Sequence, residues 1–217
     1  MEELEAIWSN RLDGVFPTDV KKVYGAPKTY SFSAKRPTRT AAKVAKPRVL
    51  IPVFPGTNCE YDTARAFESA GAQAEILVVR NLSTAAVSES VDAFAKALSQ
   101  SQILFIPGGF SGGDEPDGSG KFITAFLRNP KLADQINHLL SARDGLIGGI
   151  CNGFQALIKL GLVPYGEIRS QTADSPTLTY NTIGRHISKM VYTKVVSNKS
   201  PWMAGAKIGR ASCRERV

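Results

Sequence analysis

The chain has 217 residues, of which 43% are hydrophobic and 21% are charged, and its formal net charge is +8. This length predicts one globular domain of roughly 150 residues with extensions, and the composition excludes collagen-like, disulfide-dense and fully disordered chains. No apolar run approaches the roughly 20 residues of a membrane helix, and the acidic start (Glu2, Glu3, Glu5) is unlike a signal peptide. Three irregularly spaced cysteines indicate a reducing, cytoplasmic setting.

The positive charge lies at the two ends of the chain. Residues 1–48 carry ten Lys or Arg against five Asp or Glu, and 207–217 carry four against one. The central part, 49–206, is neutral, with thirteen of each sign. Because a nucleic-acid surface needs clustered basic residues on the folded body, this distribution argues against nucleic-acid binding.

The first 46 residues predict a short helix followed by a linker. Four large apolar residues share one helical face: Leu4, Ile7, Trp8 and Leu12. The stretch 26–40 is rich in Pro, Ser, Thr, Lys and Arg and has little apolar surface to bury. We therefore expect residues 1–46 to form a helix and a basic interdomain tether.

From residue 49 onward, short apolar runs alternate with helical patterns. The apolar runs predict four strands, at 49–54, 74–79, 103–106 and 145–150. Helical patterns fill the segments between them, with one or two helices over 119–143, and a last one continues to Leu160. This alternation predicts an α/β fold with a parallel sheet covered on both faces, whose functional groups gather at the carboxyl ends of the strands.

The fourth strand ends in the sequence Gly149-Ile150-Cys151-Asn152-Gly153. This is the form of a nucleophile elbow, with Cys in place of Ser. The sharp turn strains the backbone of the nucleophile and requires small flanking residues. The thiol then lies at a helix N-terminus, which favours the reactive thiolate. We predict that Cys151 is a nucleophile; the alternative is a buried structural cysteine.

The neighbouring third strand ends at Gly108-Gly109-Phe110. Two glycines there allow backbone N–H groups to point at a ligand, as an oxyanion hole requires. An ordinary turn is the alternative, but the elbow at the same sheet edge favours the functional interpretation. The run that follows is not a phosphate-binding loop, because Phe122 stands where Ser or Thr is needed after Lys121.

The remaining cysteines and histidines carry weaker signals. Cys59, after the first strand, lacks the Gly-flanked pattern, and we expect it to be structural or adjacent to a ligand. No C-x-x-C or H-x-x-x-H pattern occurs, so we expect no metal site. His138 and His186 are expected to be surface residues rather than catalytic bases.

Three runs together resemble a class I (triad) glutamine amidotransferase domain, most closely the glutaminase part of phosphoribosylformylglycinamidine synthase of purine biosynthesis. They are Pro55 to Asp62, Pro107 to Ser111 and Gly149 to Gln155. The resemblance implies a flavodoxin-like three-layer sandwich with a mainly parallel sheet, incomplete at its C-terminus, in a partial domain over 47–206. Residues 1–46 resemble the join in single-chain versions, where an ATP-dependent synthetase half comes first.

The resemblance also implies roles for individual residues. Cys151 would attack the side-chain amide of glutamine, forming a glutamyl thioester and releasing ammonia. The N–H groups of Gly109 or Phe110 and of Asn152 would stabilise the oxyanion. Two residues would lie beside the bound glutamine: Gln155 and Gly108. This chain would need no cofactor, whereas ATP and Mg²⁺ would act in the synthetase half, its expected partner.

The sequence departs from the family in its last third. The family activates its Cys with a His held by a Glu in a Pro-x-x-His segment, and no His follows His186. General-base help is worth roughly 10²–10⁴ in rate, so we expect the chain alone to be nearly inactive. Residues 207–217 look like translated sequencing adapter, and we expect a non-native tail.

Two other functions remain open from the sequence. One is another hydrolase with a cysteine elbow, or a DJ-1-like protein, although the Gly-Phe-Gln continuation after Asn152 argues against it. The other is a non-catalytic module that docks on a synthetase half and presents an ammonia channel.

Overall fold

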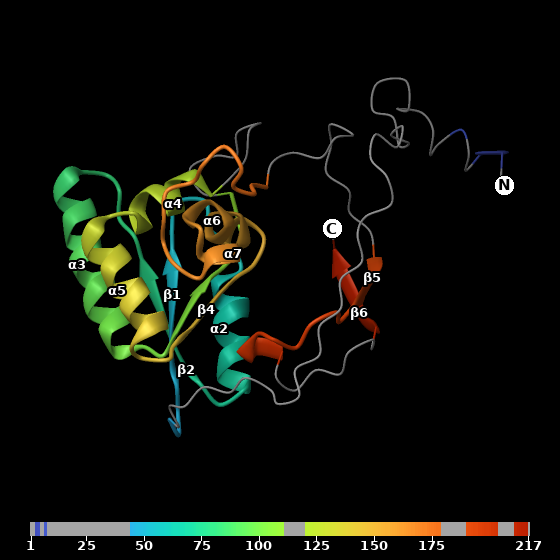
Figure 1. Ribbon diagram of the computed structural model, residues 1–217, viewed down its shortest axis with the longest axis horizontal. Coiled ribbons are helices and arrows are strands. Elements are labelled where there is room, and N and C mark those ends of the chain that lie inside the picture. Colours follow the sequence, from blue (N-terminus) through green and yellow to red (C-terminus); the bar gives the residue numbers. More distant parts are fainter. Residues whose placement is uncertain are drawn as a thin grey trace. The chain divides into compact units, whose positions relative to one another are not determined.

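The computed structural model describes residues 3, 4, 7, 44–110, 120–178, 190–203 and 211–216 (Figure 1). The chain divides into two compact units, one formed by residues 40–179 and the other by residues 1–39 with 180–217. The larger unit therefore ends before residue 206, where the sequence analysis placed the end of the amidotransferase domain. The boundaries at 46/47 and 206/207 stay predictions.

The larger unit alternates strands with helices. Its elements in chain order are β1 (Arg48–Val53), α2 (Glu60–Ser69), β2 (Gln73–Val78), α3 (Thr84–Gln100), β3 (Ile103–Ile106), α4 (Lys121–Leu127), α5 (Pro130–Ser141), β4 (Leu146–Gly149), α6 (Asn152–Leu160) and α7 (Leu162–Tyr165). The four strands pair in the order β2-β1-β3-β4, and every pairing is parallel. The predicted α/β architecture with a parallel sheet is confirmed.

Helices cover both faces of this sheet, as a three-layer sandwich requires. Figure 1 shows α3 and α5 on one side of the strands and α2 on the other. Successive residues of β1 point to opposite faces: Leu50 belongs to a large core cluster with residues of α3 to α6, while Val49 and Ile51 belong to a smaller cluster with Ala64 of α2. All three β1 side chains are fully buried, so β1 is buried on both faces, as the apolar run predicts.

The strands and helices end one or more residues away from the expected positions where backbone groups form hydrogen bonds in turns. Phe54 lies outside β1 because its carbonyl accepts the N–H of Thr57 at 2.8 Å, which starts a turn. Ile150 lies outside β4 and is 58% exposed, since the chain leaves the sheet there. The expected helical stretch 119–143 forms two helices, because Asn129 caps α5 through the Lys131 N–H and Pro130 occupies its first turn.

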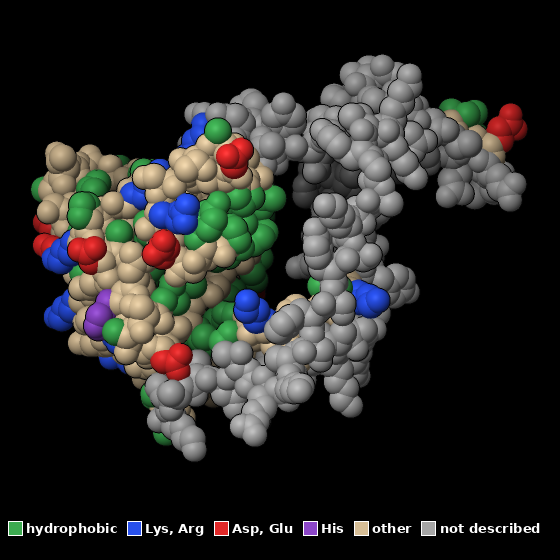
Figure 2. Space-filling view, viewed as in Figure 1, with side chains coloured by type: hydrophobic (Ala, Val, Ile, Leu, Met, Phe, Trp, Pro, Cys, Tyr) green, Lys and Arg blue, Asp and Glu red, His purple; other side chains and the backbone are tan. Residues whose placement is uncertain are grey.

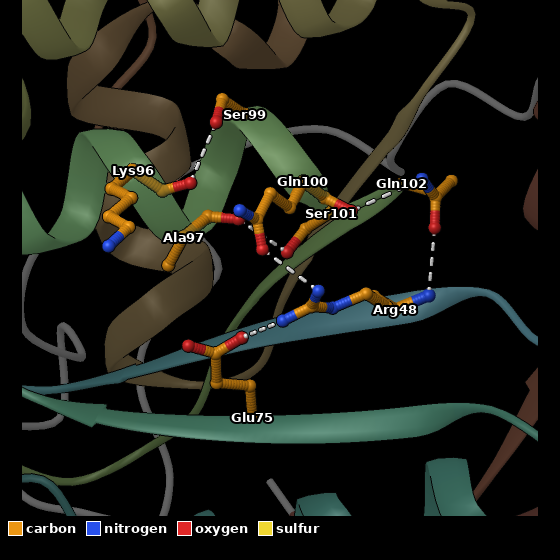
Figure 3. Close-up of polar contacts among 8 residues, drawn as sticks. All are labelled: Arg48, Glu75, Lys96, Ala97, Ser99, Gln100, Ser101 and Gln102. Carbon is orange, nitrogen blue, oxygen red and sulfur yellow. Dashed lines mark hydrogen bonds and ion pairs between the residues drawn. The ribbon is translucent and has the colours of Figure 1, made fainter.

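Arg48 ties three elements together at the amino end of the sheet (Figure 3). Its guanidinium donates to Gln100 Oε1 at 2.9 Å and forms an ion pair with Glu75 Oε2 of β2 at 2.8 Å. Its backbone N–H donates to Gln102 Oε1 at 2.9 Å. These contacts lie at the strand ends opposite Cys151, so they hold the sheet and the end of α3 without touching the candidate site.

The smaller unit contains elements that the sequence did not predict. Strand β5 (Met190–Lys194) pairs antiparallel with β6 (Ala211–Arg216), and η1 (Pro201–Met203) is a 3₁₀ turn. Residues 3, 4 and 7 are helical, as expected, with Leu4 and Ile7 exposed. The predicted anchor Trp8 and the linker up to residue 43 lie outside the described residues.

Lys and Arg alternate with Asp and Glu over the visible face of the larger unit (Figure 2). Within the described ranges, no helix is both long and apolar enough to span a membrane.

Candidate active site

Cys151 lies in a strained turn between β4 and α6. Its backbone has φ 52° and ψ −113°, a combination that non-glycine residues rarely adopt. The turn is closed by the Gly153 N–H, which donates to the Ile150 carbonyl at 2.9 Å, and α6 begins with the Gln155 N–H on the Cys151 carbonyl at 2.9 Å. The strain that the elbow pattern predicts is therefore present at Cys151.

The glycines that flank Cys151 are required by close backbone contacts. A β-carbon on Gly153 would lie 2.1 Å from the Ile106 carbonyl oxygen of β3, and one on Gly149 would lie 2.8 Å from the Gly153 carbonyl carbon. Neither contact leaves room for a side chain. The start of α6 thus packs directly on the strands, which brings the thiol to the edge of the sheet.

The Cys151 side chain is exposed, and its thiol is not in a disulfide. The alternative of a buried structural cysteine is therefore wrong. Phe110, Ile150 and Phe154, all near the carboxyl ends of β3 and β4, are also exposed, at 62%, 58% and 40%. The thiol is accessible at a partly apolar surface, where a small substrate can reach it.

The segment after β3 lies directly beside Cys151. A β-carbon on Gly108 would lie 3.3 Å from Cys151 Cβ and 4.0 Å from its Sγ. Gly108 and Gly109 are buried, and Gly109 has φ 135°, which glycine tolerates far better than other residues. The structure thus brings the two predicted motifs together at one sheet edge.

The two backbone donors that the sequence analysis left open differ in their bonding. The Phe110 N–H donates to the Gly56 carbonyl at 2.8 Å, and the Asn58 N–H donates to the Gly108 carbonyl at 3.1 Å. These two bonds form an isolated antiparallel bridge between Thr57 and Gly109. The Gly109 N–H takes no part in this bridge, whereas the Phe110 N–H is already hydrogen-bonded. Gly109 is therefore the better candidate donor to an oxyanion.

Asn152 and Gln155 lie in the first turn of α6. The Asn152 side chain is buried, and its Nδ2 donates to Gln155 Oε1 at 3.4 Å, while Gln155 is half-buried. The Asn152 backbone N–H follows Cys151 immediately at the positive end of the helix dipole. Both residues thus lie in the helical turn that directly follows the thiol.

Cys59 is the second exposed free thiol of the larger unit. It precedes α2 with φ 69° and ψ 11°, a left-handed conformation that the sequence pattern did not indicate, and its Sγ contacts Asn58 Oδ1 at 3.2 Å. Its carbonyl accepts both the N–H and the hydroxyl of Thr63, which starts α2.

The histidines and metal-ligating groups form no catalytic cluster in the described parts of the chain. His138 is exposed on α5, as expected for a surface residue, and His186 lies outside the described residues. No group of three or more His, Cys, Asp and Glu side chains there is placed to hold a metal ion.

Sequence reasoning missed the contact of the loop 56–58 with the segment 108–110. The Gly56-Thr57-Asn58 run was visible as a turn after the first strand. Nothing in the sequence, however, shows that this turn pairs with residues about 50 positions later.

Comparison with known proteins places these features in a family. The model of the CobB/CobQ-like glutamine amidotransferase domain matches residues 46–214. The chain is 38% identical over 152 residues to phosphoribosylformylglycinamidine synthase subunit PurQ of Dehalococcoides mccartyi, covering 70% of this chain and 54% of that protein. It is 34% identical over 180 residues to the PurQ subunit of Methanococcus maripaludis, covering 79% and 61%. The chain thus spans little more than half the length of these curated relatives.

A solved structure gives the same result for the fold. The structure of PurLQS from Thermotoga maritima superposes with a TM-score of 0.54 at 28% identity, covering 77% of this chain and 64% of that chain. The flavodoxin-like amidotransferase fold is therefore shown for this chain by both sequence and structure.

Proposed function

Because the chain belongs to the CobB/CobQ-like glutamine amidotransferase family, we propose that it is the ammonia-supplying glutaminase part of a phosphoribosylformylglycinamidine synthase. The names of the relatives support this assignment, since they are PurQ subunits of that enzyme. The observation that carries it is the exposed Cys151 in a strained elbow, beside the glycines that follow β3.

The chemistry begins with the Cys151 thiolate, which attacks the side-chain carbonyl carbon of glutamine. The N–H groups of Gly109 and Asn152 stabilise the negative charge that develops on the oxygen. The C–N bond then breaks, a proton passes to the leaving nitrogen, and ammonia departs from a glutamyl thioester. Water hydrolyses the thioester to glutamate and restores the thiol. Gln155 and Gly108 border the glutamine in this proposal.

The proton on the leaving nitrogen requires a general acid and base. The described part of the chain places no histidine at Cys151, because His138 lies on α5. We therefore expect glutamine hydrolysis by this chain to be slower than in a complete triad by about 10²–10⁴-fold.

The proposal includes a partner, a synthetase half that binds ATP and Mg²⁺ and uses the ammonia. The similarity of this chain to PurLQS from Thermotoga maritima supports such an assembly. The exposed free thiols of Cys59 and Cys151 agree with a reducing, cytoplasmic setting.

Labelling by the chloroketone analogue of glutamine tests the nucleophile. The experiment is done at pH 9, so that ionisation of the thiol does not depend on a base. We expect one adduct by intact mass, located on Cys151, and protection by free glutamine. Cys151→Ser should abolish labelling, whereas the matched variant Cys59→Ser, which removes the other exposed thiol of the larger unit, should leave it unchanged. Labelling at Cys59, or no protection by glutamine, would refute the assignment.

The docking module of the sequence analysis predicts a different result. It predicts no glutamine-protected adduct, and no glutamine-dependent turnover when a separately produced synthetase half is added with ATP and Mg²⁺. A Cys-elbow hydrolase of another class would react without protection by glutamine.

A further inference from the structure

We propose that the loop 56–58 is a positioning element for the oxyanion hole, and that Thr57 and the Asn58 N–H hold the Gly109 N–H in place beside Cys151. The inference rests on the proposed function. It concerns residues that touch neither the reacting sulfur nor the elbow.

Thr57 closes a turn that is anchored in the core. Its N–H donates to the Phe54 carbonyl at 2.8 Å, and its Oγ1 accepts the Phe54 N–H at 3.0 Å. Phe54 is only 1% exposed and packs edge-to-face against Phe122 and Phe126. The turn therefore has a fixed position relative to β1, an interior strand of the sheet.

This turn holds the segment after β3. Asn58 N–H donates to the Gly108 carbonyl, and Phe110 N–H donates to the Gly56 carbonyl, one bond on each side of Gly109. A β-carbon on Gly109 would lie 2.4 Å from the Gly56 carbonyl oxygen and 2.7 Å from Thr57 Cα. The two backbones are thus in direct contact, and the peptide planes on both sides of Gly109 are bonded.

The same segment also contacts Cys151, because Gly108 lies against Cys151 Cβ. The segment 108–110 therefore lies between the loop 56–58 and the nucleophile. Any displacement of the loop changes the direction of the Gly109 N–H relative to Cys151. A misplacement of about 1 Å in a reacting geometry can cost about 10²-fold in rate.

Thr57→Val tests the role of the hydroxyl. Valine keeps the shape and the backbone N–H but leaves the Phe54 N–H without its acceptor. The readout is the ratio of two labelling rates at Cys151, pH 9. The chloroketone places a carbonyl oxygen in the oxyanion hole before the C–S bond replaces the C–Cl bond. Iodoacetamide only exchanges iodide for sulfur and needs no oxyanion hole.

We expect Thr57→Val to lower the chloroketone rate by about 10- to 100-fold and to leave the iodoacetamide rate unchanged. Thr57→Ser retains an acceptor and should restore most of the chloroketone rate. Thr63→Val is the matched control, because it also removes a threonine hydroxyl bonded to the backbone, but on α2, and it should change neither rate.

A second pair of variants keeps the test valid if Thr57→Val does not fold. Asn58→Pro removes the N–H that donates to the Gly108 carbonyl. Asn58→Ala retains this N–H. We expect the selective loss of chloroketone reactivity in the proline variant alone.

An equal loss of both labelling rates, or an unchanged ratio in both Thr57→Val and Asn58→Pro, would overturn the positioning role. If the wild-type chain shows no glutamine-protected chloroketone adduct, the proposed function fails first and this inference fails with it. The two failures are therefore distinguishable by the behaviour of the wild-type chain.

Discussion

Replacing Gly153 with alanine has two opposing effects at the start of α6. Alanine is favoured over glycine in a helix by about 1 kcal/mol, so an isolated helix would gain stability. In the folded chain, however, the new β-carbon would lie 2.1 Å from the Ile106 carbonyl oxygen and 2.8 Å from its carbon. Both atoms belong to the backbone of Ile106, the last residue of the buried strand β3, so they cannot rotate away as a side chain could.

The steric effect should exceed the gain in helix propensity. Overpacking of a close-packed site typically costs about 1–3 kcal/mol, and a contact this short with a backbone carbonyl places the cost at the upper end. After subtraction of about 1 kcal/mol for helix propensity, we expect Gly153→Ala to lower the free energy of unfolding by about 2 kcal/mol. Because α6 must move away from β3, the chloroketone rate at Cys151 should fall as well.

Urea denaturation followed by circular dichroism measures this change, and the slope m shows whether the native state remains compact. Gly71→Ala is a suitable control, because Gly71 has φ 91° but no atom within 4 Å of the added carbon. It should show only the backbone cost of a positive φ, about 1–2 kcal/mol, with no loss of labelling. A Gly153→Ala variant as stable as the wild type, with a normal labelling rate, would refute the packing argument.

Three further substitutions test the fold. Phe54→Ala removes a fully buried ring that packs on two other aromatic rings, and we expect a loss of about 3–5 kcal/mol in urea denaturation; a loss below about 1 kcal/mol would contradict the packing. Asn129→Ala removes the cap of α5 and should cost about 0.5–2 kcal/mol, which Asn129→Asp should largely avoid. Glu75→Gln breaks the ion pair with Arg48, in which each side chain is 35% exposed. We expect the free energy of unfolding to fall by at most about 1 kcal/mol, and this difference should shrink in about 1 M salt. A larger loss that does not depend on salt would show that the pair is not acting as a surface ion pair.

Local patterns were sufficient for the parts of the fold that depend on neighbouring residues. The four apolar runs predicted the strands to within a residue or two, because a strand buried on both faces needs a continuous apolar segment. The elbow at Cys151 was also predictable from its local pattern, since Gly149 is needed for a contact within the same turn, whereas the contact of Gly153 with the Ile106 carbonyl of β3 belongs to the tertiary structure. Boundaries such as Phe54 and Ile150 differed because turn hydrogen bonds, which apolarity does not reveal, end the strand pairing.

The amino-acid sequence by itself determined the alternation of strands and helices, the family and the strained turn at Cys151, because each follows from residues that are adjacent in the chain. Only the tertiary structure decided which backbone N–H beside Cys151 is already bonded and which remains a candidate donor. That choice depends on the bridge between the loop 56–58 and the segment 108–110. Any backbone can form such a bridge, so the hydrogen bonds leave no mark in the side-chain pattern, and the parallel packing of β1 against β3 brings the two segments together.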